Sequence, residues 1–370
     1  MTKRRVFEII CLTSILAGCA TSHRVPRDGS AEIVETFLAQ ATETHPRQSE
    51  GDVIALKNGT LLAAWTDFSG GPADHATAVI SAAKSTDGGR TWGERFVLQE
   101  NIGSQNVMSA SLLRLRTGEI LFFFLQKNSA TDLKLMVRRS RDDAQTWSEP
   151  QIVTPEPGYH IMNNARAIQL KSGRLLCPIS YCEDIFSREC RLRNFVYLSD
   201  DNGRTWRRSA DVVECDKRGA MEPGLVELKN GNVLQIIRTQ LGQIWFSVSA
   251  DGGDKWSAPK PFGVESPESP STIARTPNGK LLLVYNPNNP PGVSHVNART
   301  PLVGALSADE GKTWSPPKVI EASPDATYAY TSLTFLGDRV LLSYYFAPNG
   351  TKQYSLKFKN IPLAWFGENQ

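Results

Sequence analysis

One short pattern recurs along this chain and limits the folds that are open to it. The pattern, called the box below, is Ser-x-Asp-x-Gly-x-Thr-Trp with small changes; its five copies are STDGGRTW from Ser85, SRDDAQTW from Ser140, SDDNGRTW from Ser199, SADGGDKW from Ser249 and SADEGKTW from Ser307. A glycine turn and an apolar run precede each box, as in LKNGTLLAAW from Leu56. A sixth turn and run, FLGDRVLLSYY from Phe335, has no box after it. The chain therefore holds six copies of a unit of roughly 50 to 60 residues.

Each repeat is expected to form a four-stranded antiparallel sheet. Its order is strand, tight turn, strand, connection, strand, box and strand. Six separate sheets cannot each bury both faces, whereas a radial arrangement lets every sheet pack against two neighbours. The sequence therefore predicts an all-β fold, a six-bladed β-propeller of four-stranded antiparallel blades that spans residues 31–370 as a single domain. Because the last repeat lacks a box, residues 32–38 are the candidate strand that completes its sheet.

The box has a structural role in this fold. Its Asp is expected to accept hydrogen bonds from the turn backbone, its Gly to adopt a positive φ, and its Trp to pack between neighbouring sheets. The five tryptophans are Trp92, Trp147, Trp206, Trp256 and Trp314. Ligand binding by the boxes is the alternative. The boxes therefore indicate the fold and do not by themselves reveal a reaction.

The first 30 residues have the pattern of an export signal. Basic residues near the start precede a short apolar run from Val6 to Ala17, and the run ends in LAGC at Cys19. This order resembles a bacterial lipoprotein signal, in which residues 1–19 end at the cysteine that becomes lipidated. Ala20 follows the cysteine, so the outer membrane is the expected destination, with residues 20–30 as a tether. An ordinary cleaved signal peptide is the alternative.

Charge, cysteine content and the lack of metal-binding motifs limit the kinds of partner and cofactor expected for the chain after its leader. The formal net charge of the chain is +3, and the leader contains an excess of basic residues, so the remaining chain is nearly neutral and gives no sign of a nucleic-acid partner. Four cysteines remain after Cys19, and Cys182 and Cys190 are the expected disulfide pair in an oxidising compartment. No CxxC or HExxH pattern occurs, so the sequence supports no metal site.

The order of the strands predicts that the candidate functional residues share one face of the disc-shaped propeller. The glycine turns and the boxes share one face, so the starts of first strands and the ends of second strands lie on the opposite face, around the central axis. Arg166 is expected there as a surface ion pair or as a contact to the leaving group of a substrate. The other candidates on this face are Arg47, Glu50, Asp52, Asp67, Asp74, His75, Asn106, Asn163, Asn164, Glu222, Arg238, Glu268, Asn286, Arg299, Tyr328 and Tyr330.

These boxes and rim residues resemble the sialidase (neuraminidase) superfamily over essentially the whole exported chain. MEPGLVELKNGNVLQIIR is similar to the family segment that carries a catalytic Glu and one arginine of a triad, so the resemblance assigns these roles to Glu222 and Arg238. RTPLVGALSADEGKTW places Arg299 where the family has its third arginine. AYTSLTFL looks like the family's nucleophile segment, with Tyr330 as the tyrosine. Asp74, in FSGGPADHA, falls in the loop of the acid/base Asp.

One segment departs from the family pattern. Sialidases open the first blade with an arginine that an Ile-Pro pair follows closely, whereas this chain has HPRQSEGDVI. Arg47 is the candidate for the first arginine, but Glu50 and Asp52 lie beside it and put the substrate in doubt. Additional rim residues besides these two are Asp67, His75 and Asn163.

The resemblance implies a retaining exo-α-sialidase that needs no metal and no organic cofactor. Three arginines would bind the sugar carboxylate, Tyr330 would attack with Glu222 as its base, and Asp74 would be the acid/base. The implied partners are sialylated or other acidic glycans, and outer-membrane lipid through Cys19. Two alternatives stay open: a glycoside hydrolase of the same fold that acts on another acidic sugar, and a noncatalytic glycan-binding propeller.

Overall fold

The computed structural model describes residues 32–288 and 299–367, and this part of the chain is almost entirely β-structure. The expected leader, Cys19 and the tether lie outside the described residues. None of the helical segments in the described part has the length and apolar character needed to span a bilayer. A short 3₁₀ helix, η1, covers Leu363–Phe366.

Four of the sheets contain four antiparallel strands each. The first has the order β2 (Arg47–Ala55), β3 (Leu61–Phe68), β4 (Ala78–Ser85), β5 (Phe96–Gln99). Another has the order β15 (Met221–Glu227), β16 (Val233–Arg238), β17 (Gln243–Ser249), β18 (Lys260–Glu265). The next is β19 (Thr272–Arg275), β20 (Leu281–Tyr285), β21 (Leu302–Ser307), β22 (Lys318–Glu321), and the last is β23 (Ala326–Leu336), β24 (Arg339–Pro348), β25 (Ser355–Pro362), β1 (Val34–Ala39).

The prediction of a separate sheet for each repeat is wrong for the second and third repeats. Their strands belong to one nine-stranded sheet made of β6 (Asn106–Arg114), β7 (Ile120–Ser129), β8 (Asp132–Ser140), β9 (Gln151–Ile152), β10 (Gly158–Ile161), β11 (Ile168–Gln169), β12 (Leu175–Cys182), β13 (Arg193–Ser199) and β14 (Arg207–Arg208). The connecting strand β10 causes the merger, because it pairs in parallel with β8 and antiparallel with β12.

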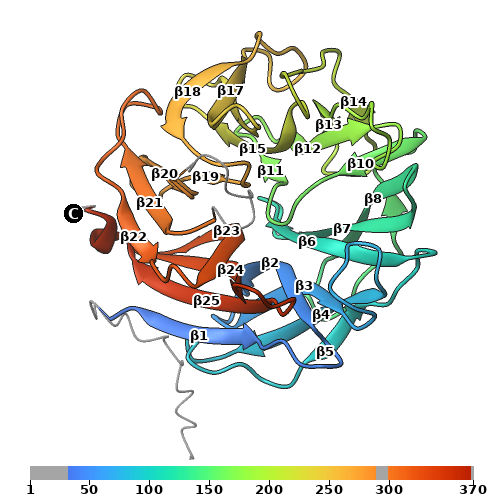
Figure 1. Ribbon diagram of the computed structural model, residues 1–370, viewed down its shortest axis with the longest axis vertical. Helices are drawn as coiled ribbons and strands as arrows, with labels where there is room; N and C mark the ends of the chain where they lie inside the picture. The colour runs from blue at the N-terminus through green and yellow to red at the C-terminus, as the bar shows by residue number, and fades with distance from the viewer. Residues whose placement is uncertain (1–31, 289–298, 368–370) are drawn as a thin grey trace, which may run out of the picture. The chain divides into compact units, whose positions relative to one another are not determined.

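The sheets are arranged around a common centre, as Figure 1 shows, with β2, β6, β11, β15, β19 and β23 nearest the middle. Residues from all six of these strands line one cavity of about 440 Å³. Strand β1 pairs with β25, with Val34 opposite Asn360, which confirms that a strand from the start of the repeat region completes the last sheet. The architecture is thus a β-propeller-like ring.

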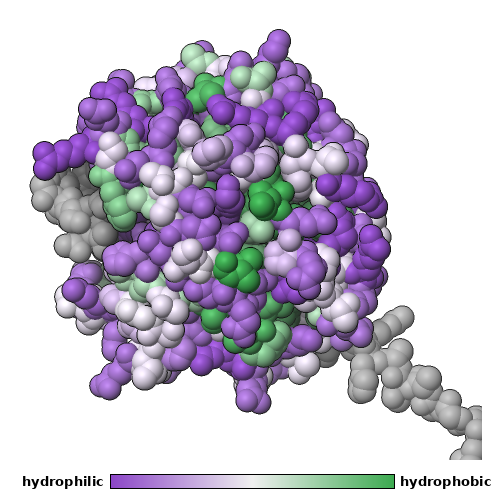
Figure 2. All heavy atoms as spheres, turned by 90° about the vertical axis from the view of Figure 1, so that its right-hand side faces the viewer, coloured by the Kyte–Doolittle hydropathy of each residue, from purple (hydrophilic) through white to green (hydrophobic). Residues whose placement is uncertain are grey.

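The hydrophobic core lies between neighbouring sheets. One cluster joins Ile80 of β4 to Phe122 of β7, and another joins Leu282 of β20 to Tyr344 of β24. The radial arrangement lets each sheet bury both of its faces against its neighbours. This burial stabilises the fold, because the removal of apolar area from water is the main favourable contribution to folding. The outer face seen in Figure 2 is mainly hydrophilic, with scattered apolar patches.

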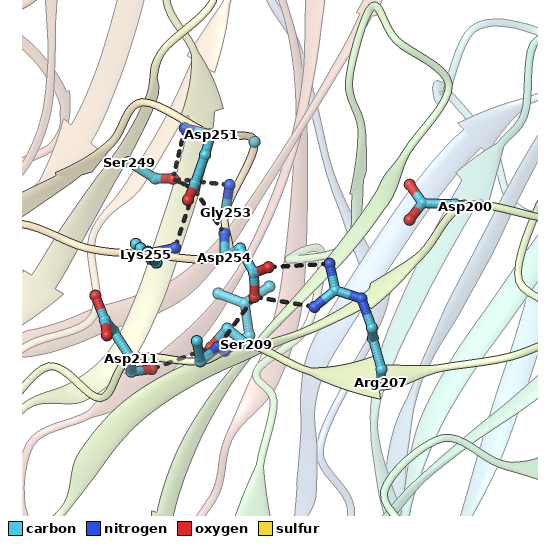
Figure 3. A network of polar contacts seen from close by, with 12 residues as sticks. Asp200, Arg207, Ser209, Asp211, Ser249, Asp251, Gly253, Asp254 and Lys255 are labelled. Atoms are coloured by element: carbon cyan, nitrogen blue, oxygen red, sulfur yellow. Dashed lines mark hydrogen bonds and ion pairs between the residues drawn. The ribbon is translucent and has the colours of Figure 1, made fainter.

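The boxes form hydrogen-bonded turns, as expected. In the fourth box the Asp251 carboxylate accepts bonds from Ser249 Oγ at 2.8 Å and from the Lys255 backbone N–H at 2.9 Å (Figure 3). Asp254 in the same box binds Arg207 of β14 through two contacts of 2.9 and 3.1 Å (Figure 3). The boxes therefore also connect one repeat to the next.

The box tryptophans pack against aromatic rings of the sheets. Trp92 meets Phe358 of β25 edge-on at 5.1 Å between ring centroids, and Trp206 meets Phe123 of β7 at 5.9 Å. These contacts cross from one repeat to its neighbour, which confirms the predicted packing. Only Trp256 is buried, however, and the other four are half-buried.

The innermost strands carry β-bulges. The register shifts between Ser49 and Asp52, between Met108 and Ser111, between Met221 and Gly224, and between Ala329 and Ser332. Each bulge contains a non-glycine residue with positive φ: Glu50 at 54°, Ser109 at 60°, Glu222 at 43° and Tyr330 at 58°. Such bulges redirect side chains and are common beside functional sites. All four side chains line one pocket.

The expected disulfide is not present in this structure. Cys182 and Cys190 are both free thiols, although they lie in hydrogen-bond contact with each other. The loop between them carries Ile185, which lines the same pocket as the bulge residues. The sequence therefore predicted which cysteines are neighbours, and the structure leaves them unbonded.

Candidate functional site

A pocket of about 330 Å³ opens at the face that strand order predicted. Of the candidate residues, it brings together Arg47, Glu50, Asp74, Asn163, Glu222, Arg238, Arg299 and Tyr330. Residues that the sequence did not single out complete its wall: Met108, Ser109, Leu125, Leu133, Tyr159, Ile161, Ile185, Leu192, Arg218, Met221, Tyr345 and Tyr354. The pocket is thus charged on one side and largely apolar on the other.

Tyr330 and Glu222 form a hydrogen-bonded pair at the bottom of the pocket. The Tyr330 hydroxyl donates to Glu222 Oε1 at 3.2 Å, and the bulges of β23 and β15 direct both side chains inward. Burial and the charge of Glu222 raise the pKa of Tyr330, although Arg238 and Arg299 oppose the shift. Burial alone would raise the pKa of Glu222, but Arg238, Arg299 and Asn163 outweigh it and lower that pKa. Glu222 therefore stays ionised beside a neutral tyrosine.

Arg238 and Arg299 lie beside this pair. Arg238, at the end of β16, donates from Nη1 to Glu222 Oε2 and from Nη2 to Glu268 Oε1, the latter at 3.2 Å. Arg299, just before β21, donates to the Tyr345 hydroxyl at 2.7 Å, and its Cζ lies 5.6 Å from the centroid of the Tyr330 ring. Both side chains are buried, so an anion that reaches them would interact with their guanidinium groups in a medium of low dielectric constant, in competition with Glu222 and Glu268 for Arg238.

Arg47 is shared between two carboxylates. Its Nη2 donates to Glu50 Oε1 at 2.8 Å and its Nη1 to Asp74 Oδ1 at 2.5 Å. Burial alone would raise the pKa of Asp74, but Arg47, followed by Lys127 and His75, lowers it. Burial raises the pKa of Glu50, with Arg47 opposing and Asp74 adding to the shift. The Asp74 side chain is 66% exposed, whereas that of Glu50 is 4% exposed, so Asp74 is the carboxylate that faces the opening.

The loop that carries Asp74 is held from below. Asn106 donates from Nδ2 to the carbonyls of Asp74 and Ala76, both at 2.8 Å, and Lys127 Nζ donates to the Asp74 carbonyl at 3.1 Å. Lys127 is buried and lies 5.3 Å from the centroid of the Tyr159 ring. Sequence reasoning did not single out Lys127, although it lies near the end of β7, the second strand of its repeat, where strand order places residues on the pocket face.

Several candidate residues do not line the pocket, among them Asp52, Asp67, His75, Asn164 and Glu268. Asp52 is buried lower in the centre, where its carboxylate accepts from the backbone N–H groups of Val53 and Leu112 at 2.8 Å each. Burial raises its pKa to about 7. Asp67 is buried in an ion pair with Arg95 at 2.7 Å, and His75 is exposed in the loop beside Asp74.

The prediction for Arg166 is wrong. The side chain is buried and donates to Thr272 Oγ1 and to the Ser271 carbonyl at 3.0 Å each. It contacts neither the surface nor the pocket, because it points into the cavity at the centre of the ring. Burial lowers its pKa to about 10, with Glu222 as the largest opposing charge.

No group of three or more His, Cys, Asp or Glu side chains in residues 32–288 and 299–367 is arranged to hold a metal ion. The polar groups of the pocket are guanidinium groups, carboxylates and tyrosines. This set suits a ligand that carries a negative charge and hydroxyl groups, with arginine forks for a carboxylate.

Fold and pocket together define a β-propeller-like protein with a pocket of arginines, carboxylates and tyrosines on one face. A family model described as "BNR repeat-like domain" matches residues 59–342, and the chain belongs to this family, within the sialidase superfamily. The resemblance seen in the sequence is thereby confirmed.

Curated relatives are sialidases of modest identity. The sialidase of Micromonospora viridifaciens is 28% identical over 381 residues, which cover 93% of this chain and 56% of the relative. The sialidase of Paraclostridium sordellii is 30% identical over 235 residues, 56% of each chain. The chain thus spans little more than half the length of these relatives.

Solved structures share the fold. Trypanosoma rangeli sialidase with 2,3-difluorosialic acid has a TM-score of 0.72 and 16% identity over 90% of this chain and 60% of that chain. A Dyadobacter fermentans protein of unknown function has a TM-score of 0.70 and 22% identity over 89% of this chain and 99% of that chain. At these identities the likeness concerns the fold.

Proposed function

We propose that this protein is a retaining exo-α-sialidase that removes terminal sialic acid from glycoconjugates. The observation that carries the proposal is the Tyr330–Glu222 pair, with 3.2 Å between its oxygens, in a pocket that also contains Arg47, Arg238 and Arg299. We also infer that the six repeats act as six blades, since six innermost strands line one central cavity even though two repeats share a sheet.

The arginines account for recognition of an acidic sugar. A sialic acid carries its carboxylate on the anomeric carbon, where the glycosidic bond is attached. Guanidinium groups bind a carboxylate through two parallel hydrogen bonds and stay charged at every working pH. The three arginines that line the pocket would fix the sugar ring with its anomeric carbon over Tyr330.

The tyrosine accounts for the attack. An Asp or Glu nucleophile would be repelled by the sugar carboxylate, whereas a neutral phenol is not. Glu222 takes the proton of the Tyr330 hydroxyl as the bond from the tyrosine oxygen to the anomeric carbon forms and the bond to the leaving oxygen breaks. Asp74 donates a proton to that leaving oxygen. Water then attacks the anomeric carbon while Asp74 takes its proton, the bond to the Tyr330 oxygen breaks, and Glu222 returns its proton to that oxygen, so that the configuration is retained.

The contact between Arg47 and Asp74 connects binding to acid catalysis. In the empty pocket Arg47 lowers the pKa of Asp74, which is the wrong direction for a proton donor. A substrate carboxylate competes for the same guanidinium and draws it away from Asp74. Binding would therefore raise the pKa of Asp74 and prepare it to donate.

A second candidate is a hydrolase that acts on another acidic sugar. Glu50 favours it, because this buried carboxylate already occupies one side of the Arg47 fork at 2.8 Å. A ligand with a smaller or displaced carboxylate, or with a hydroxyl group directed at Glu50, would fit this arrangement.

We further propose that the enzyme is exported and anchored to the cell envelope through lipid on Cys19. The proposal is supported by the LAGC sequence at the end of the apolar run. An anchored enzyme would meet sialylated glycans outside the cell, where sialic acid is a terminal residue.

Turnover of an activated aryl α-sialoside tests the mechanism. Tyr330→Phe should keep the fold and the KM and lower kcat by at least about 10³-fold, because only the nucleophilic hydroxyl is lost. Arg299→Ala should instead raise KM, and it is a cleaner binding variant than Arg238→Ala because Arg238 also holds Glu222. A parent that turns over sialosides while Tyr330→Phe keeps near-parent kcat would refute the tyrosine mechanism. A parent that cleaves only other acidic glycosides would favour the second candidate, and saturable glycan binding without turnover would indicate a binding protein.

A further inference from the structure

The backbone at Tyr330 is held in a conformation that it would not adopt alone. Tyr330 has a φ of 58°, in the left-handed region, inside the bulge between Ala329 and Ser332. A bulky non-glycine residue is strained there and stays only if its surroundings determine its position. The groups that hold this bulge therefore set where the Tyr330 hydroxyl lies.

Asn164 holds the bulge directly. Its Nδ2 donates to the Tyr330 carbonyl at 2.9 Å and to the Gly51 carbonyl at 2.8 Å. Gly51 lies in the bulge of β2, next to Glu50, so one amide connects two bulges from different sheets. Asn164 has 0% exposure and does not line the pocket, so it cannot contact a ligand there.

Arg166 holds the next residue through one intermediate. It donates to Thr272 Oγ1 at 3.0 Å, and Thr272 Oγ1 donates to the Thr331 carbonyl at 2.8 Å. The Thr331 hydroxyl returns a bond of 2.7 Å to Thr272 Oγ1. A buried guanidinium thus fixes the hydroxyl that fixes the carbonyl after Tyr330.

We propose that Asn164 and Arg166 are positioning residues, which act through the Tyr330 backbone to keep its hydroxyl against Glu222. The proposal rests on the proposed role of Tyr330 as the nucleophile. Both residues come from the segment between β10 and β11, whereas Tyr330 lies on β23. The third repeat therefore supports the nucleophile that the sixth repeat supplies.

Kinetics of Asn164→Ala provide the first test. Small misplacements of a reacting group lower the rate strongly, so kcat for an activated aryl sialoside should fall by about 10- to 100-fold while KM stays within about twofold. Asn360→Ala is the matched control, because Asn360 on β25 is a buried amide that donates to the Gly88 carbonyl of the first box at 3.0 Å. The control should lose thermal stability to a similar extent and keep the parent kcat.

The Arg166 variants separate positioning from simple destabilisation. Arg166→Lys keeps a donor for Thr272 and should retain more kcat than Arg166→Met, with KM unchanged in both. Equal kcat in parent, Asn164→Ala and Arg166→Met would overturn the proposal. If Asn164→Ala does not fold, the comparison of Arg166→Lys with Arg166→Met decides by the same criterion.

A crystal structure of a folded variant, Asn164→Ala or Arg166→Met, keeps this test independent of the proposed activity. The Tyr330 φ should leave the left-handed region, or the distance from the Tyr330 hydroxyl to Glu222 should lengthen from 3.2 Å. An unchanged bulge would refute the positioning role even if the parent cleaves no sialoside. A parent without turnover, but with a displaced bulge in the variant, would refute the proposed function alone.

Discussion

Trp256→Ala tests whether the boxes hold the sheets together. Trp256 is 9% exposed, packs with Leu198, Val213 and Val233, and donates from Nε1 to the Gly253 carbonyl at 3.1 Å. Truncation removes the indole and leaves a cavity, which should cost about 3–5 kcal/mol of the free energy of unfolding. Trp206 is half-buried, and its Nε1 has no acceptor among the described residues, so Trp206→Ala should cost about 1.5–3 kcal/mol.

Urea unfolding followed by circular dichroism measures both costs, because the signal does not depend on the tryptophans that are removed. The midpoint should fall further for Trp256→Ala than for Trp206→Ala, with similar slopes against urea concentration. The kcat of the folded fraction should match that of the parent in both variants. Urea midpoints that are equal in the parent and both variants would refute the structural role of the boxes. Variants with the stability of the parent but without glycan binding would refute it as well.

Three further predictions concern the anchor, the acid and the boxes at low pH. Cys19→Ala should move the protein from the membrane fraction to the soluble fraction, because the acyl chains supply most of the attachment; unchanged fractionation would exclude lipidation. Asp74→Asn should slow sialosides with poor leaving groups far more than activated aryl sialosides, and equal losses on both would show that Asp74 is not the proton donor. Desolvation is the largest single cause and raises the pKa of Asp87, but its hydrogen bonds to Thr91 and Ser85 together outweigh this and lower that pKa from the ordinary 3.8 to about 2. The stability from this box should therefore be present above pH 4 and lost as the pH falls through about 2, so Asp87→Asn should reduce the parent's loss of stability between pH 4 and pH 2, and an unchanged acid-unfolding curve would contradict the role of this carboxylate.

Much of the fold could be predicted because the repeat is local. Each box contains its own hydrogen-bond donors and acceptors within a few residues, as the contacts of Asp251 to Ser249 and Lys255 show. The strand that completes the last sheet also followed from the repeat count. The merger of the second and third repeats could not be predicted, because β10 is a connecting segment whose pairing depends on which strand edges lie within its reach.

The rim candidates show where strand alternation fails. Glu50 and Asp52 lie two residues apart at the start of one predicted strand, so regular alternation would direct both side chains to the same face of the sheet. The bulge between Ser49 and Asp52 interrupts this alternation. Glu50 therefore reaches the pocket, and Asp52 points to the Leu112 backbone instead. Asp67 faces Arg95, on the side of its sheet away from the pocket.

The sequence by itself determined the repeat, the turns and the types of residue at the central mouth, because these depend on interactions between residues close together in the chain. The family resemblance implied that Tyr330 and Glu222 act together. Only the tertiary structure decided the 3.2 Å contact between them, the sharing of Arg47 between Glu50 and Asp74, and the hydrogen bond from Asn164 to the bulge behind the tyrosine. The contacts of Tyr330 with Glu222 and Asn164 join different sheets, whereas those of Arg47 lie within the first repeat and depend on the bulge at Glu50. Their geometry depends on the bulges and on the packing of the whole ring, which no short stretch of sequence encodes.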